Sequence, residues 1–263
     1  MKKSLFSALL AALLAVACSA AGDEWQLVWE ENFDRDGLID EAVWSKIPRG
    51  SADWNNYMSD YEGLYDVRDG NLVLTGMVNP GIEGDSVPYI TGGIYTKDKV
   101  DFADGKIEIR ARFEDARGAW PAFWMLPNDG TMWPRGGEID IMERLNADTM
   151  VYQTVHSYYT YILKYEDEPP HYATGAINKD DYNTFSVELY ADSLVFAVNG
   201  RRTFAYPRIE TDKEEQFPYD RPYYLMLDMQ IEGSWVGPAA PEDLPVSVYV
   251  DWVRFYKKRK NRH

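Results

Sequence analysis

The chain has 263 residues, enough for one large β domain, because β-sandwiches and barrels run to about 200–250 residues as single units. Its net charge of −16 at pH 7 argues against nucleic acid and anionic membranes as partners and favours a neutral or weakly charged polymer. The single cysteine, Cys18, excludes an internal disulfide, and one cysteine with 3 histidines is too few for a zinc cluster.

Residues 1–17 predict a secretory signal peptide. Two lysines precede an apolar run from Leu5 to Val16, which is too short to span a membrane as a permanent helix. Cys18 follows a small-residue boundary and resembles the lipidation site of a bacterial lipoprotein, although alanine stands where leucine is usual three residues earlier. We expect Cys18 to begin an exported outer-membrane lipoprotein, on its periplasmic or cell-surface side, that meets the membrane only through this anchor. The alternative is cleavage to a soluble secreted or periplasmic protein.

Residues 24–257 predict one all-β domain. Short runs of alternating apolar and polar residues recur between turn residues, and helical periodicity is almost absent. No linker, repeat or low-complexity block interrupts them, so we expect a monomeric β-sandwich or jelly roll, followed by a solvated basic tail at 258–263. The predicted strands are Trp25–Glu30, Leu72–Thr75, Gly93–Lys97, Gly105–Phe113, Phe123–Leu126, Ile139–Glu143, Tyr152–His156, Asn183–Leu189, Ser193–Val198, Tyr223–Gln230 and Val246–Tyr256.

Three dipeptides predict hairpin turns between these strands. Asn-Gly at 199–200 lies inside the clearest hairpin, residues 195–204, and Asp-Gly occurs at 69–70 and again at 129–130.

The most informative stretch is Gly136–Glu143, in which acidic and apolar residues interleave. Side chains alternate along a strand, so Glu138 and Asp140 share a face. Glu143 joins that face only if one residue loops out, and a β-bulge at Ile141-Met142 would do this. If the two glutamates lean together, they approach the ~5–5.5 Å spacing that a retaining glycosidase uses for its nucleophile and its proton donor.

Three acids on one strand face repel one another. Repulsion raises the pKa of at least one of them, which keeps a carboxyl group protonated near neutral pH. The alternative interpretation is a solvated polar face of an ordinary strand.

The flanking residues favour catalysis, because they resemble a known family. Residues 120–127 (WPAFWMLP), 133–134 (WP) and 137–143 (GEIDIME) are similar to glycoside hydrolase family 16 in its bulged E-x-D-x-x-E branch, and the likeness extends from Trp29 to Tyr256. The resemblance implies a β-jelly roll whose concave sheet forms the cleft for an oligo- or polysaccharide. It also implies Glu138 as nucleophile, Glu143 as acid/base, Asp140 as the residue that assists them, and no catalytic cofactor.

The same resemblance implies further cleft residues. Trp124, Trp133 and Trp235 match tryptophans that stack on sugar rings, His156 matches a histidine near the acid/base, and Asn56 matches a loop asparagine that contacts sugar hydroxyls. Each has a plainer alternative, core packing for tryptophan and a structural role for histidine. Gln230 and Asp228 lie two residues apart on one predicted strand, and either can face the cleft.

Many family members hold a structural calcium ion, and the corresponding places here are Glu31 or Asn32, Gly70 and Asp251. Oxygen ligands of this kind suit Ca²⁺. The alternative is that Asp251 merely lies in the last strand.

Three departures from the pattern of glucan-cleaving members bear on the substrate. Gly93 replaces an arginine, His156 is followed by Ser-Tyr rather than Trp-Gly, and residues 228–233 read DMQIEG where Asn-x-Ala-x-Gly-Gly is usual. The tyrosine-rich stretch 158–165 is similar to that of endo-β-galactosidase-like members. We therefore expect a retaining endo-β-1,4-galactosidase acting on host or mucin O-glycans or on poly-N-acetyllactosamine. The alternatives are a laminarinase-type endo-β-1,3-(1,4)-glucanase and, in a different class, a non-catalytic carbohydrate-binding protein.

Overall fold

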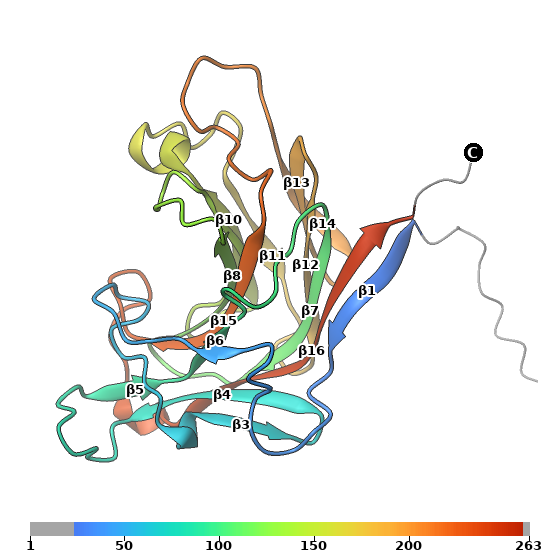
Figure 1. Cartoon of the computed structure of the whole chain (residues 1–263). Coiled ribbons are helices and arrows are strands. Elements are labelled where there is room, and N and C mark those ends of the chain that lie inside the picture. Colours follow the sequence, from blue (N-terminus) through green and yellow to red (C-terminus); the bar gives the residue numbers. More distant parts are fainter. Residues whose placement is uncertain (1–23, 260–263) are drawn as a thin grey trace, which may run out of the picture.

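Two antiparallel sheets packed face to face form the domain (Figure 1). The computed structural model describes residues 24–259, so the predicted signal peptide, Cys18 and most of the basic tail lie outside the described residues. One sheet runs in the order β14-β13-β12-β7-β16-β4-β3, with β1 beside β16 and β5 beside β4. The other sheet runs β11-β10-β9-β8-β15-β6-β2. The strands are β1 (Trp25–Glu31), β2 (Ser45–Lys46), β3 (Tyr65–Arg68), β4 (Asn71–Val78), β5 (Tyr89–Thr91), β6 (Gly93–Tyr95), β7 (Gly105–Phe113), β8 (Ala119–Pro127), β9 (Glu138–Glu143), β10 (Met150–His156), β11 (Tyr172–Ala176), β12 (Asn183–Leu189), β13 (Ser193–Val198), β14 (Arg201–Pro207), β15 (Tyr223–Ile231) and β16 (Val246–Lys258).

Period-two burial explains why the sheets pair as they do. In β7 the apolar residues Ile107, Ile109 and Ala111 are fully buried, while the polar residues between them are partly exposed. The inner face of the second sheet meets them with residues such as Phe123 and Leu225. The apolar faces of both sheets therefore close over a single main core, as expected for the predicted jelly roll.

The 11 predicted strands are present, some of them extended at their ends, and β14 is the second strand of the predicted hairpin at 195–204, but four short strands escaped prediction. These four are β2, β3, β5 and β11, which have two to five residues, too few to establish an alternating pattern. Three short helical segments also occur, at Glu62–Leu64, Tyr158–Ile162 and Pro241–Asp243. No helix within residues 24–259 is long and apolar enough to cross a membrane.

Two of the three predicted hairpin turns are confirmed. Residues 69–70 join β3 to β4 and residues 199–200 join β13 to β14, and in each turn both residues have positive φ, as a type I′ turn requires. Residues 129–130 also lie between two paired antiparallel strands, β8 and β9, but within a longer connection, residues 128–137, rather than in a two-residue turn. The Asp129 carboxylate holds this loop by accepting from the Thr131 N–H (2.9 Å) and from Arg221 (3.0 Å).

The predicted bulge in β9 is present. Asp140 pairs with Trp124 and Met142 with Phe123 on β8, which leaves Ile141 as the extra residue. Ile141 and Met142 are both fully buried. The buried Gln153 side chain donates to the Ile141 carbonyl (2.8 Å), which satisfies an oxygen that the bulge removes from the ladder. As a result Glu138, Asp140 and Glu143 all face outward from the core.

Candidate active site

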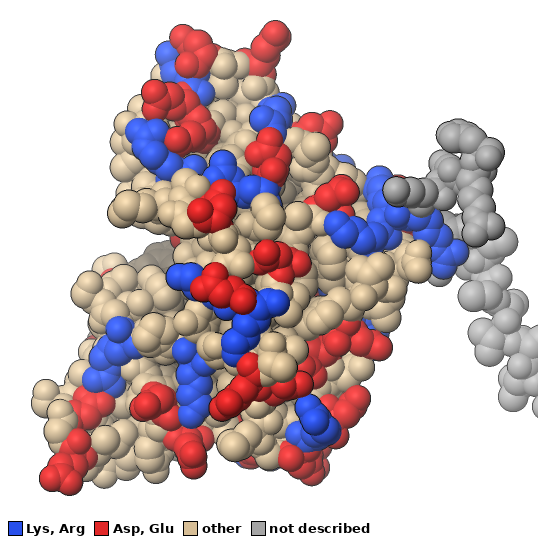
Figure 2. Space-filling view, viewed as in Figure 1, with Lys and Arg blue, Asp and Glu red and all other residues tan. Residues whose placement is uncertain are grey.

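A cleft of about 900 Å³ lies on the outer face of the β8–β9–β10–β15 sheet, the face turned away from the core. The space-filling view shows the molecule hollowed on its left side, with few charged atoms at the mouth of the hollow (Figure 2). The cleft is lined mainly by acidic and aromatic residues: Ala52, Trp54, Trp120, Ala122, Trp124, Leu126, Trp133, Glu138, Asp140, Glu143, Tyr152, Thr154, His156, Tyr161, His171, Tyr172, Gln230 and Trp235.

Strand β9 places the three predicted acids in this cleft. His156 on β10 stands directly opposite Glu138, and its Nε2 atom lies 3.9 Å from Glu138 Oε1 and 3.5 Å from Asp140 Oδ2. The Trp120 indole N–H donates to Glu143 Oε1 (3.0 Å). Asp140 is 3% exposed, and its Oδ2 atom is buried without a hydrogen-bond partner. The three acids are therefore close together and shielded from water, and hydrogen bonds from the protein satisfy only some of their oxygens.

Burial changes the proton affinity of the two glutamates. Desolvation raises the pKa of Glu138 to about 7, while the Trp133 side chain acts to lower it. Desolvation raises the pKa of Glu143 further, to about 8, where the charges of Glu138 and Asp228 add to the effect. Burial therefore favours the protonated form of both glutamates near neutral pH, and the charges of Glu138 and Asp228 act on Glu143 in the direction that a proton donor requires.

Asp140 and His156 complete the group. Burial, followed by the charges of Glu138, Glu143 and Asp228, raises the pKa of Asp140 well above its usual value. Burial lowers the pKa of His156 to about 4, so its ring is neutral at pH 7. Glu138, Asp140 and His156 each bring one potential metal-ligand atom within 4.8 Å of the others, an arrangement that the sequence did not predict. Catalytic side chains that act on the same substrate atom must lie equally close together, so this spacing alone does not indicate a metal ion.

Two of the three predicted tryptophan platforms are exposed in the cleft. Trp133 is 45% exposed and packs edge-on against Tyr161, on the side of Glu138. Trp235 is 46% exposed and packs edge-on against Trp120 and Tyr152, on the side of Glu143. The two rings therefore stand near opposite ends of the acid-bearing strand.

The loop that carries Trp235 is tied to the opposite loop. Asp53 Oδ2 accepts from both the backbone N–H of Ser234 (2.9 Å) and its hydroxyl group (2.7 Å).

The third predicted tryptophan, Trp124, is 5% exposed and lies in the cleft floor. Its indole N–H donates to Asp228 Oδ2 (2.8 Å), and its ring meets Trp54 edge-on. Gln230 also lies in the floor and donates to Asp228 Oδ1 (2.8 Å). Of the pair on β15, Gln230 lines the cleft, while Asp228 is completely buried beneath it.

One predicted contact residue is not brought to the cleft. Asn56 does not line it, and Ala52 and Trp54 represent that loop instead. Six aromatic lining residues were not assigned a role from the sequence: Trp54, Trp120, Tyr152, Tyr161, His171 and Tyr172. Alternation could have revealed Trp120 and Tyr152, because each lies four residues from a predicted cleft residue, Trp124 or His156, on the same strand.

The segments predicted to hold calcium are adjacent in the first sheet. Strand β16 pairs Val253 with Glu31 and Val250 with Leu72, which sets Asp251 beside the β3–β4 turn that contains Gly70. Asp251 Oδ2 is paired with Arg110, and Glu31 Oε1 accepts from the Phe33 N–H (3.0 Å). The Arg110 cation competes with a calcium ion for Asp251, so the residues fit the ion poorly as they stand, and calcium binding stays a prediction.

Comparison with known proteins agrees with this geometry. The family model described as glycosyl hydrolases family 16 matches residues 55–254. A keratan-sulfate endo-1,4-beta-galactosidase of Sphingobacterium multivorum is 34% identical over 92% of this chain, which spans 57% of that protein's length. The laminarinase structure of Rhodothermus marinus is 28% identical, with a TM-score of 0.80 over 90% of this chain and 98% of its own.

A further structure, reported with endo-acting O-glycanases that members of the human gut microbiota express to initiate mucin breakdown, is 27% identical. Its TM-score is 0.77 over 89% of this chain and 100% of its own. With the bulged strand, the three outward acids and the matched residues together, the chain belongs to glycoside hydrolase family 16.

Proposed function

We propose that this protein is a retaining, endo-acting β-glycoside hydrolase that cuts β-1,4-galactosidic bonds within host or mucin O-glycans or poly-N-acetyllactosamine. The observation that carries the reaction type is the bulge in β9, which turns two buried glutamates with raised pKa values into one aromatic cleft. The pair of carboxyl groups that a retaining glycosidase needs is thus available on a single strand.

The reaction proceeds in two displacements. A Glu138 carboxylate oxygen attacks the anomeric carbon while Glu143 gives its proton to the departing glycosidic oxygen, so a glycosyl ester forms as the old bond breaks. Glu143, now ionised, takes a proton from a water molecule that attacks the same carbon and releases Glu138. Asp140 and His156 border Glu138 and orient it (3.9 Å from His156 to Glu138).

The proposed substrate is supported by both kinds of relative. By their descriptions, the first is a keratan-sulfate endo-1,4-beta-galactosidase, and the second belongs with endo-acting O-glycanases that initiate mucin breakdown. The absence of a side chain at Gly93, where glucan-cleaving members carry arginine, also favours the galactosidase over the glucanase. Arginine at this position would also need rearrangement, because even a β-carbon on Gly93 would stand 2.8 Å from the Asp228 β-carbon.

A laminarinase-type endo-β-1,3-(1,4)-glucanase is the second candidate. It is favoured by the close backbone match to the Rhodothermus marinus laminarinase. The two candidates share the catalytic acids and differ in the residues around them.

One panel of polymers separates the two candidates. The mature protein is incubated with laminarin, mixed-linkage glucan, agarose, keratan-type poly-N-acetyllactosamine and porcine mucin O-glycans, and the products are identified by mass. Oligosaccharides with reducing galactose from the last two support the galactosidase. Glucose oligomers from laminarin, with no release from the galactose-containing substrates, would replace it with the glucanase.

We also propose, from the sequence of residues 1–18, that the protein is exported and lipidated at Cys18. Metabolic labelling with a radioactive fatty acid should mark the wild type and spare a Cys18→Ala variant. Equal labelling of both would contradict the proposal.

A further inference from the structure

The cleft floor contains a hydrogen-bond acceptor that nothing in the described protein uses. Gln230 is 2% exposed and lines the cleft, and its Oε1 atom is buried without any partner. Leaving a buried polar atom without a partner destabilises the folded protein, so such atoms are uncommon unless a ligand supplies the missing hydrogen bond.

The orientation of this amide group is fixed by Asp228. Each Asp228 oxygen accepts one hydrogen bond, Oδ2 from the Trp124 indole N–H and Oδ1 from Gln230 Nε2, both at 2.8 Å. Burial raises the pKa of Asp228 to about 7. Above that pH the carboxylate accepts and does not donate, so it holds the NH₂ end of the Gln230 amide and turns the oxygen end away. A reversed amide would place two acceptors in contact.

The place of Asp228 in the sheet puts this acceptor near the reacting bond. Across the outer face, Glu143 pairs with Ala122, Ala122 with Asp228, and Asp228 with Gly93. The neighbours on both sides are therefore small, and a β-carbon at Gly93 would stand 2.8 Å from that of Asp228. The Asp228 side chain therefore fits between β15 and its neighbour β6 because the residue opposite it, Gly93, has no side chain.

Gln230 itself pairs with Trp120, the residue that donates to Glu143. Strands lie roughly 4.8 Å apart, so Gln230 is about two strand spacings from β9. A sugar bound across β8, beside the glutamates, is the group that can reach its oxygen.

We propose that Gln230 determines specificity by accepting a hydrogen bond from the sugar bound beside Glu143, and that Asp228 is the positioning residue that selects the oxygen end of the amide. The donor on the sugar is a hydroxyl group or the N–H of an acetamido group. This inference rests on the proposed glycoside hydrolase function and does not depend on which polysaccharide is cleaved.

A double-mutant cycle tests it on whichever polymer the enzyme cleaves. Gln230→Met keeps the length of the side chain and removes the acceptor, so KM should rise roughly tenfold with little change in kcat, as for one lost hydrogen bond made equally in ground and transition states. Asp228→Asn keeps the acceptor for Trp124 but presents NH₂ to Gln230, which should reverse the amide. Asp228→Asn should raise KM at least as much as Gln230→Met does. In a protein that already carries Gln230→Met, Asp228→Asn should change KM very little, because there is no amide left to reverse.

Paired substrates identify the donor. Wild-type enzyme should cleave a lactosamine-type oligosaccharide faster than its glucose analogue if the donor is the acetamido N–H, and Gln230→Met should lose that preference. If the donor is a hydroxyl group, wild-type enzyme should instead cleave the natural substrate faster than the deoxy analogue that lacks this hydroxyl group, and Gln230→Met should lose that preference. Thermal unfolding of each variant verifies that it folds.

Two results would overturn the inference: a KM of Gln230→Met within twofold of wild type, or an Asp228→Asn effect of equal size in both backgrounds. A glucan cleaved in place of a galactan overturns only the proposed substrate, since the cycle is then measured on the glucan.

Discussion

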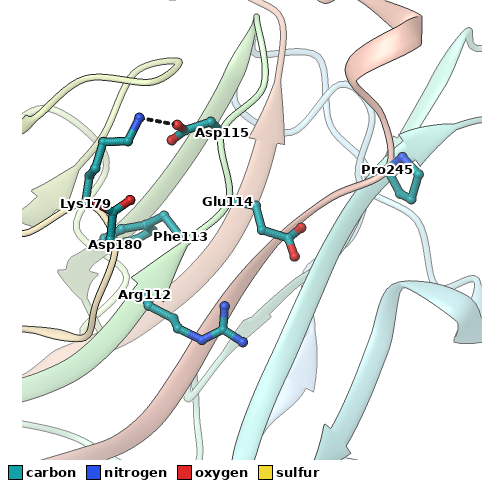
Figure 3. Close-up of a pocket in the computed structure, with 7 residues that line it drawn as sticks. All are labelled: Arg112, Phe113, Glu114, Asp115, Lys179, Asp180 and Pro245. Atoms are coloured by element: carbon teal, nitrogen blue, oxygen red, sulfur yellow. Dashed lines mark hydrogen bonds and ion pairs between the residues drawn. The ribbon is translucent and has the colours of Figure 1, made fainter.

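Two clusters of charged residues in this protein have opposite character. In the cleft, Glu138, Glu143 and Asp140 are crowded without a cationic side chain among them, and burial raises the pKa of each. A second cavity of about 610 Å³ lies at the end of β7, where Asp115 faces Lys179 (Figure 3).

In that second cavity the charges satisfy one another. Asp115 pairs with Lys179 at 2.6 Å and with the fully buried Arg144 at 2.5 Å. Burial alone would raise the pKa of Asp115, but the hydrogen bonds and charges of these two cations lower it overall. Glu114 accepts from the Ser247 N–H (2.9 Å) and from the Tyr249 hydroxyl group (2.8 Å).

The contrast separates structural charges from chemical ones. A paired acid with a lowered pKa, such as Asp115, stabilises the fold, whereas crowded acids with raised pKa values are maintained at a cost to stability and are available for proton transfer. Substitutions in the two clusters should therefore have different consequences.

The largest effect is expected for Glu138→Gln. It removes the nucleophile and nearly preserves the shape, so kcat should fall by more than about 10³ while oligosaccharide binding survives. Steady-state kinetics and calorimetric titration measure the two properties. If hydrolysis continues near the wild-type rate, Glu138 is not the nucleophile, and loss of both properties would indicate a structural role.

The pH profile should come next in size. Activity requires Glu138 ionised, with its pKa of about 7, and Glu143 protonated, with its pKa of about 8. The rate should fall below the lower value, as Glu138 gains a proton, and above the higher one, as Glu143 loses its proton.

Asp228→Asn sharpens this prediction. The Asp228 charge raises the pKa of Glu143, so its removal should move the alkaline limb of kcat/KM to lower pH. An unmoved alkaline limb would mean that Asp228 does not influence the acid.

Trp235→Ala should have a smaller effect, mainly on binding. Loss of this exposed ring removes a stacking surface beside Glu143 and should raise KM roughly tenfold, with kcat reduced less. Trp252→Ala, on β16 of the other sheet, is the matched control and should leave KM unchanged. Equal changes in the two variants would show that the effect is not local to the cleft.

The smallest catalytic effect is expected for Glu114→Gln in the second cavity. One of the two accepting oxygens becomes an NH₂ group, which should lower the free energy of unfolding by about 1–3 kcal/mol. Chemical denaturation measures that loss, and kcat/KM per folded molecule should equal that of wild type. A fall in kcat without a loss of stability would contradict the division between the clusters.

The two clusters also differ in how well the sequence predicts them. Glu138, Asp140 and Glu143 lie within one strand, so alternation and a single bulge were sufficient to place them on one face. Asp115, Arg144 and Lys179 are separated by 29 and 64 residues along the chain, and no local pattern indicates that they meet.

The same limit applies inside the cleft. His171 lies against His156, with ring centroids 6.1 Å apart, because β11 pairs with β10, and β11 is too short for its pattern to be recognised. The sequence indicated that Gln230 and Asp228 lie two residues apart on one strand and that either can face the cleft. Only the three-dimensional contacts show that one lines the cleft and the other is buried under it.

The most direct test of the central claim, that the crowded acids of β9 carry out a double displacement, is NMR of the anomeric proton during the first minutes of hydrolysis. Two inversions at the same carbon restore its configuration, so the β anomer of the new reducing end should appear first and convert slowly to the equilibrium mixture. Initial appearance of the α anomer would show a single displacement by water and would contradict the assignment of Glu138 as the nucleophile.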